Sequence, residues 1–60
     1  MTLKRAITIL KSEMKFLGVT LGMLESLIET QPGAFSSETI TAHRRYLDHR
    51  AWVRLQAESD

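Results

Sequence analysis

The chain contains no cysteine, which excludes disulfide bridges and metal sites built from thiolates. Its two histidines, His43 and His49, would point about 120° apart on one helix, so they cannot hold a metal together within it. A domain of this length buries only about 60% of the surface that its unfolded chain exposes. With disulfides and metals excluded, oligomerisation is the route to stability that remains, and we expect no cofactor.

Excess charge and long apolar runs are also missing. Eight Lys and Arg nearly balance seven Asp and Glu, so the net charge of +1 gives no strong attraction to nucleic acid or anionic lipid. The stretch 16–24 carries no charge but is far shorter than the roughly 20 residues of a membrane span. The N-terminal stretch lacks the long apolar core and the cleavage site of a secretory signal. We therefore expect a cytoplasmic protein without a membrane partner.

Proline occurs once, at Pro32, and the segment 31–35 around it is the only predicted break in the chain. Pro32 disfavours helix at the preceding residue, and Pro-Gly is a strong turn signal. Ser36 can then cap a second helix, with Glu38 in its first turn. We predict one domain over residues 1–60, with a helix at about 3–30, a loop at 31–36 and a second helix at about 37–58.

The most regular feature of the chain is an apolar repeat in its first half. Its members alternate in steps of four and three residues: Leu3, Ile7, Leu10, Met14, Leu17, Leu21, Leu24 and Ile28. This period buries one continuous line of side chains along a partner helix. Because a short loop makes two helices antiparallel neighbours, we predict an all-α fold, an antiparallel helical hairpin. The expected neighbours across it are Ile28 with Ile40, Leu24 with His43, Leu21 with Leu47, Leu17 with Ala51, and Met14 with Leu55.

The hairpin leaves apolar side chains without a partner. The longer first helix would carry Leu3 and Ile7 past the end of the second, and both helices have a second apolar line on another face. A helix that is apolar on two sides usually has two partners. We therefore predict a homodimer that forms a four-helix assembly; the alternatives are a higher oligomer, or one broad core face with scattered exposed apolar residues. The expected dimer interface contains Leu3, Ile7, Ile9, Phe16, Met23, Tyr46 and Val53.

Two of the few glycines, Gly18 and Gly22, lie inside the first predicted helix. Each costs a helix interior roughly 1 kcal/mol relative to Ala. Being four residues apart, they share a face and could admit another backbone closely, or they could only loosen the middle of the helix. The sequence leaves these two interpretations equal.

Catalytic patterns are absent from the sequence, which has no Gly-rich phosphate loop and no nucleophile beside a base. Ser36 and Ser37 are expected at the helix start as caps. His43 is expected to be a partly buried, hydrogen-bonded residue near the contact between the helices. We therefore expect a protein that is not an enzyme.

Trp52 is the strongest candidate for a binding residue. On the second helix it shares a face with Arg45, His49 and Gln56, away from the apolar lines. An exposed Trp among polar groups is a common arrangement at binding hot spots. We predict an unidentified partner protein on this face, although Trp52 could instead fill the dimer interface, and the sequence leaves both possibilities open.

Basic residues indicate a competing function. Arginine suits phosphate contacts, and binding of RNA or DNA would use Arg44, Arg45, Arg50, Arg54, Lys4 and Arg5. The arginines are spread around the second helix rather than gathered in one stripe. Several also have acidic neighbours, since we expect Glu25 near Arg44 and Glu13 near Arg54. A solvated face with modest ion pairs is the favoured interpretation, and nucleic-acid binding is the alternative.

The stretches KSEMKFLGVTLGMLESL, QPGAFSSETI and HRRYLDHR resemble the small helical accessory proteins that lambdoid phages encode between their exonuclease and excisionase genes. The resemblance covers most of the chain but defines no motif, so no functional residue carries over. It implies an early, protein-binding regulator that favours lytic development and disturbs the host cell cycle, in the cytoplasm of a bacterial host. The predicted hairpin dimer also resembles plasmid-encoded RNA-binding hairpin dimers in shape alone, which keeps the RNA-binding alternative open.

Overall fold

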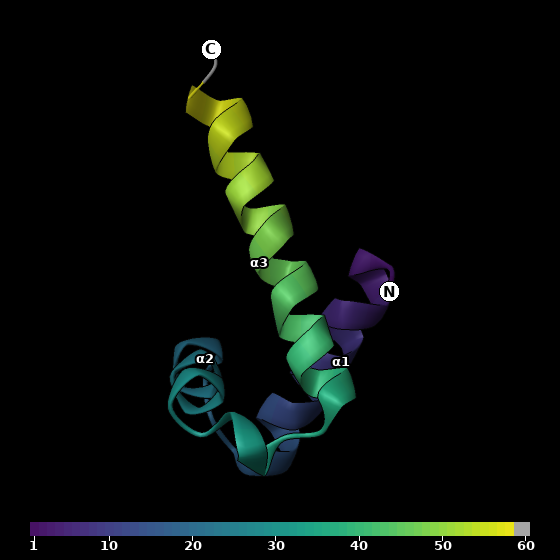
Figure 1. Cartoon of the computed structure of the whole chain (residues 1–60), viewed down its shortest axis with the longest axis vertical. Helices are drawn as coiled ribbons and strands as arrows, with labels where there is room; N and C mark the ends of the chain where they lie inside the picture. The colour runs from purple at the N-terminus through teal and green to yellow at the C-terminus, as the bar shows by residue number, and fades with distance from the viewer. Residues whose placement is uncertain (59–60) are drawn as a thin grey trace.

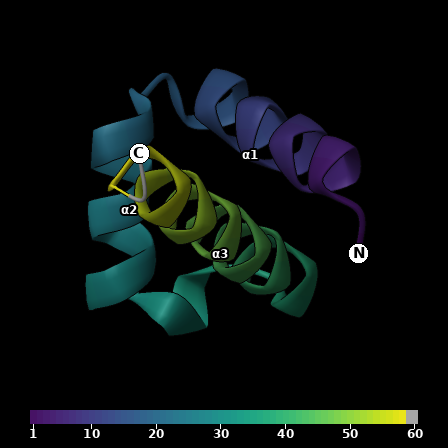
Figure 2. The ribbon, with the colours of Figure 1, turned by 90° about the horizontal axis from the view of Figure 1, so that it is seen from above.

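The computed structural model describes residues 1–58 and is built from helices (Figure 1). Three α-helices follow one another, α1 (Leu3–Leu17), α2 (Leu21–Thr30) and α3 (Ser37–Glu58), with a 3-10 turn η1 (Pro32–Ala34) before the last. Figures 1 and 2 show α1 and α2 beside the first half of α3, while the second half of α3 stands alone. The predicted all-α fold is confirmed for these residues. The last two residues of the predicted domain, 59–60, lie outside the described part.

The predicted single helix over 3–30 is wrong, because the chain turns between Leu17 and Leu21. Gly18 ends α1 in the left-handed conformation, with φ 69° and ψ 36°. The N–H groups of Gly18 and Val19 both donate to the carbonyl of Met14, at 2.8 and 3.1 Å. This is how glycine commonly terminates a helix, since it has no Cβ to clash in that conformation.

A threonine cap then starts α2 directly after the break. The Thr20 hydroxyl accepts a hydrogen bond from the N–H of Met23 at 3.3 Å, and so satisfies one donor of the first turn. An added Cβ would meet nothing within 4 Å at Gly18 or at Gly22. Within one copy, therefore, neither glycine is needed to let a second backbone approach closely. The role of Gly18 is instead to end the helix.

The start of α3 agrees with the prediction. The Ser36 hydroxyl accepts a hydrogen bond from the N–H of Thr39 at 3.3 Å, and the Ser36 carbonyl accepts from Ile40 at 3.1 Å. Ser36 is therefore the cap, and the helix covers 37–58 as predicted. The predicted loop at 31–36 contains the 3-10 turn, in which Pro32 supplies the first position.

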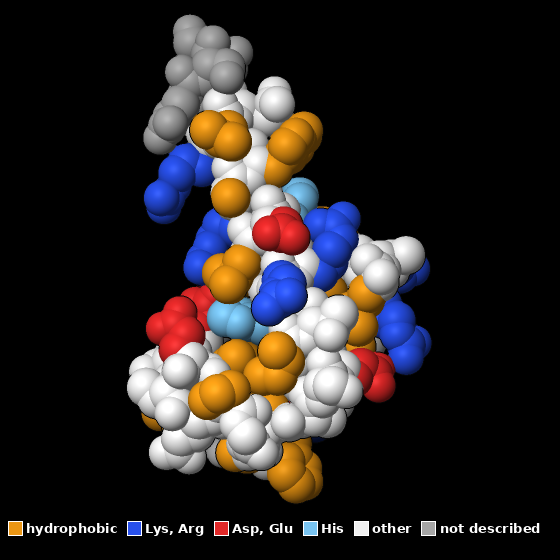
Figure 3. Space-filling model, viewed as in Figure 1, with side chains coloured by type: hydrophobic (Ala, Val, Ile, Leu, Met, Phe, Trp, Pro, Cys, Tyr) orange, Lys and Arg blue, Asp and Glu red, His pale blue; other side chains and the backbone are white. Residues whose placement is uncertain are grey.

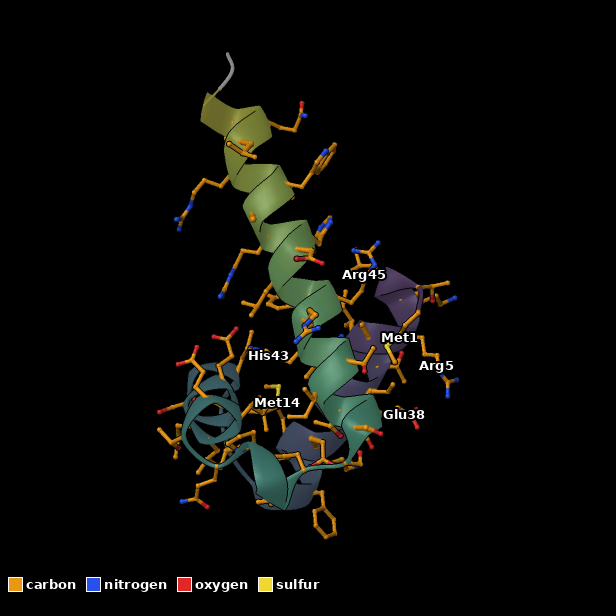
Figure 4. The ribbon with its side chains drawn as sticks, viewed as in Figure 1. Met1, Arg5, Met14, Glu38, His43 and Arg45 are labelled. Carbon is orange, nitrogen blue, oxygen red and sulfur yellow. The ribbon has the colours of Figure 1, made fainter. Side chains whose placement is uncertain are left out.

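The relative course of α1 and α3 differs from the predicted antiparallel hairpin. In such a hairpin the start of the first helix would lie near the end of the last. Instead, Arg5 Nη2 lies 3.0 Å from Glu38 Oε1, so the first turns of α1 and α3 are neighbours (Figure 4). Leu3 and Ile7 consequently do not overrun α3; both are half-buried. The turn at Gly18 accounts for this, because it splits one long helix into two short ones that both pack on the start of α3.

The core is small and lies where the three helices meet. Its buried apolar residues are Ala6, Leu10, Leu24, Ile28 and Ala42. Three of these, Leu10, Leu24 and Ile28, belong to the predicted apolar repeat. The two alanines do not: Ala42 lies on the second apolar line predicted for the last helix, and Ala6 was not predicted as a core residue.

The face that α3 buries also differs from the prediction. Its buried residues are Thr39, Ala42 and His43, with Tyr46 packed beside the core. Ala51 is exposed and Leu55 is 62% exposed, so the predicted pairings of Leu17 with Ala51 and Met14 with Leu55 are wrong. The reason is length, since α1 ends at residue 17 and cannot follow α3 to its far end.

Candidate interaction surface

The most exposed large element of the structure is the second half of α3. Between Asp48 and Ala57 every side chain is exposed except that of His49, which is half-buried. We call this segment, 48–57, the arm. Figure 1 shows it projecting from the body formed by α1, α2 and the start of α3. Ten helical residues extend about 15 Å. Because an isolated helix of this length is marginal in water, the arm is a candidate for packing against another molecule.

One side of the arm carries the residues predicted to bind a partner protein. Arg45, His49, Trp52 and Gln56 recur at helical spacing, and we call this set the recognition face. Trp52 is 58% exposed and stacks on His49, with ring centroids 6.3 Å apart and ring planes inclined by 22°. The stacking holds the indole against the helix in a defined orientation. The structure therefore brings the four residues together on one accessible face.

The opposite side of the arm forms a shallow groove. Its lining residues are Leu47, Arg50, Ala51 and Arg54, and its volume is about 480 Å³. Leu47 and Ala51 supply an apolar floor, while the two guanidinium groups flank it. We call this set the groove face. At 100° per residue it points about half a turn away from the recognition face.

A polar cluster joins α2 to α3 at the base of the arm. His43 Nε2 lies 3.5 Å from Glu25 Oε1, and Arg50 Nη1 lies 3.2 Å from the same oxygen. The His43 side chain is 6% exposed and that of Glu25 is 17% exposed. Neither His43 Nε2 nor Glu25 Oε1 has a hydrogen-bond partner of good geometry in the described part of the chain. Figure 4 places His43 on the side of α3 that faces α2.

This cluster corrects the predicted ion pairs. Glu25 contacts His43 and Arg50 rather than Arg44, and the described residues show no ion pair between Glu13 and Arg54. A signal for the cluster was present in the sequence. The predicted neighbours Leu24 and His43 already bring residue 25 within reach of α3, and Arg50 lies two helical turns beyond His43 on the same face.

The residues predicted for a dimer interface fall into two groups. Leu3 and Ile7 are half-buried, and Ile9 and Tyr46 pack against the core of the same chain. The other three are exposed: Phe16 at 85%, Met23 at 55% and Val53 at 45%. These three lie on α1, α2 and α3 respectively, so one copy leaves an apolar side chain uncovered on each helix.

The residues of the nucleic-acid alternative are not gathered into one surface. Arg5 pairs with Glu38 and Arg50 with Glu25, while the Arg50 guanidinium also lies 5.5 Å from the ring centre of Tyr46. Figure 4 places Arg45 on the side of α3 near the start of α1, where Lys4 and Arg5 lie. Arg44 and Arg54 are exposed on other sides of α3.

Metal and membrane sites find no support in the described part of the chain. No three His, Cys, Asp or Glu side chains among those that the structure describes, residues 1–57, are close enough to share an ion. No helix there has the length and apolar character needed to cross a bilayer.

In comparisons with known proteins, the chain matches no family model, no curated protein and no solved structure.

Proposed function

We propose that the protein is a small regulator without enzymatic activity that binds a partner protein through the recognition face of the arm. The observation that carries this proposal is the position of Trp52, which is 58% exposed on a helix that its own chain does not cover. Tryptophan and arginine are the residues most often found at the centre of protein interfaces, where one truncation costs about 2 kcal/mol or more. The stacking on His49 favours one orientation of the indole, which lowers the entropy lost on binding.

The working form in this proposal is a homodimer, in which four or more helices pack together. Five small to medium apolar side chains make up the whole buried core of the described chain. A core of that size barely offsets the entropy of ordering about 60 residues. Exposed apolar residues on α2 and α3, such as Met23 and Val53, supply material for a second contact. A cytoplasmic regulator of the phage accessory type would need no larger structure than this.

Nucleic-acid binding is less well supported by the geometry. Two of its arginines, Arg5 and Arg50, are engaged by glutamates of the same chain. The remaining cations of α3 lie on different sides, whereas a phosphate backbone on one face of a helix requires a row of them. Nucleic-acid binding is therefore kept as a competing outcome of the experiments described below.

Capture of partners from a bacterial lysate tests the proposal. The bait is the full chain, compared with Trp52→Ala and with the matched control Phe16→Ala, which also removes an exposed aromatic ring but lies far from the arm on α1. We expect nuclease-resistant protein partners that Trp52→Ala loses and Phe16→Ala keeps. Identical capture by all three chains would contradict the role of Trp52.

A salt titration with duplex DNA and structured RNA provides the second readout. Binding through arginines would weaken steeply as salt rises, because each neutralised phosphate releases counterions. We expect no measurable binding at low salt. Tight, salt-sensitive binding that Arg44→Ala and Arg45→Ala weaken would replace the protein-binding proposal with the nucleic-acid alternative.

A further inference from the structure

The groove face of the arm is exposed at Ala51 and Arg54, while Arg50 at its base pairs with Glu25 of the same chain. It combines an apolar floor, Leu47 and Ala51, with two guanidinium groups one helical turn apart, those of Arg50 and Arg54. Such a surface suits a helix that presents apolar groups together with carboxylates. The occupant can be sought in the charge distribution of the chain itself.

Acidic and basic residues occupy different parts of the sequence. Residues 16–43 contain three glutamates and neither lysine nor arginine, whereas residues 44–57 contain four arginines and one aspartate. Figure 3 shows this segregation on the surface, with Lys and Arg side chains along the arm and acidic side chains on α2 beside its base. The two segments are therefore electrostatically complementary.

The structure already contains one contact of this type. Glu25 of α2 and Arg50 at the start of the arm lie 3.2 Å apart within one chain. One turn further along each helix are Glu29 and Arg54, both exposed and without an ion pair among the described residues. Figure 1 shows that the C-terminal end of α3 extends well past α2, so a second contact of this type needs α2 from another molecule.

We propose that the groove face of each arm is covered by α2 of a second copy of this chain. Arg54 of one protomer then pairs with Glu29 of the other, and the exposed Met23 of α2 packs on Leu47 and Ala51. Twofold symmetry makes the exchange reciprocal, so the dimer contains two identical arm–α2 contacts. The recognition face, on the other side of the arm, stays open for the partner protein.

The size of the chain is compatible with such a dimer. A stable interface of standard size buries about 800 Å² per partner. One copy exposes 4555 Å² in total, so an interface of this size would cover less than a fifth of its surface. Because the two contacts form together, each strengthens the other as in any two-point attachment.

Charge reversal tests this contact, which rests on the homodimer proposed above. Arg54→Glu and Glu29→Arg each place like charges across both arm–α2 contacts, and each is expected to weaken dimerisation about tenfold or more. Lys15→Glu, an exposed change on α1 away from the contact, is the control and should leave the dimer unchanged. Sedimentation equilibrium over a concentration series gives the dissociation constants, and circular dichroism verifies the helical content of each variant.

Mixing the two reversed chains gives the decisive result. In the heterodimer, the two substituted side chains face each other across one contact with their charges exchanged, while the second contact keeps the original Arg54 and Glu29. We therefore expect the equimolar mixture of Arg54→Glu and Glu29→Arg to recover the affinity of the unmodified dimer. The proposal is overturned by an unmodified chain that sediments as a monomer, by single variants that dimerise normally, or by a mixture that fails to recover.

These outcomes remain separate from the fate of the proposed recognition face. If the mixture of reversed chains does not recover the dimer affinity while partner capture still depends on Trp52, only the arm–α2 contact is rejected. If the mixture recovers but Trp52→Ala keeps every partner, the dimer stands and the partner-binding role of Trp52 falls.

Discussion

His43 Nε2 and Glu25 Oε1 lie 3.5 Å apart at the junction of α2 and α3, and both atoms are buried. Arg50 approaches the same carboxylate oxygen from the exposed side. The three side chains connect α2 to α3 on both sides of Tyr46, which packs against the core. The cluster therefore joins the acidic helix to the part of α3 from which the arm extends.

Replacing Glu25 by Ala should destabilise the fold. The change removes the carboxylate that lies 3.5 Å from the buried His43 Nε2 and 3.2 Å from Arg50 Nη1, and with it an ion pair between α2 and α3. Because neither His43 Nε2 nor Glu25 Oε1 has a hydrogen-bond partner among the described residues and the Arg50 side chain is half exposed, we expect a loss of about 1 kcal/mol or less. Urea denaturation at one fixed protein concentration measures the change, since a dimer's stability depends on concentration. Asp48→Ala, the matched control at an exposed acidic residue outside the cluster and outside the proposed dimer contact, should change stability by less than about 0.5 kcal/mol.

Alanine at the two central glycines should have opposite effects. Gly18 has φ 69°, a conformation that costs a residue with a Cβ about 1 kcal/mol or more, so Gly18→Ala should lower the free energy of unfolding. Gly22 lies within α2 in open space, so Gly22→Ala should raise it by up to about 1 kcal/mol. Thermal unfolding of the two variants side by side gives the signs. Equal shifts in the same direction would contradict a chain break at Gly18.

That break is also where sequence reasoning failed, and the cause is physical. The apolar repeat continues through residues 17–21 in unchanged phase, so the pattern contains no sign of a turn. A glycine inside a helix costs only about 1 kcal/mol, and whether Gly18 is interior or terminal depends on what the chain gains by folding back. The gain is tertiary, since turning lets α1 and α2 both cover Ala42 and His43 on α3.

Other features were predictable because they depend on local chemistry. The cap at Ser36 and the bounds of α3 follow from Pro32, Gly33 and the hydroxyl that precedes the helix. The core members Leu10, Leu24 and Ile28 follow from the apolar repeat. Ala6 was missed because a single methyl group gives a weak hydrophobic signal, although it permits close packing of helices. Ala42 was expected on the second apolar line of the last helix rather than on the face that packs against the first.

Truncating a core side chain should destabilise the fold much more than truncating an exposed one. Leu10 is 3% exposed, and Leu10→Ala should cost about 2–5 kcal/mol, which a small domain cannot spare. Phe16 is 85% exposed, so Phe16→Ala should leave the unfolding midpoint nearly unchanged. Circular dichroism on both variants at the same concentration checks this. A large loss for Phe16→Ala would show that another molecule covers this ring in solution.

Fluorescence of the single tryptophan should distinguish the two sides of the arm. If the groove face forms the dimer contact, Trp52 stays 58% exposed in both forms, and its emission maximum should not move when the dimer is diluted to monomer. Acrylamide quenching should likewise be the same at both concentrations. If Trp52 instead fills the dimer interface, dilution will shift its emission to longer wavelength and increase quenching, because the indole becomes exposed to water. Binding of a partner protein to the recognition face should produce the opposite change, a blue shift with reduced quenching, in the unmodified chain and equally in Phe16→Ala.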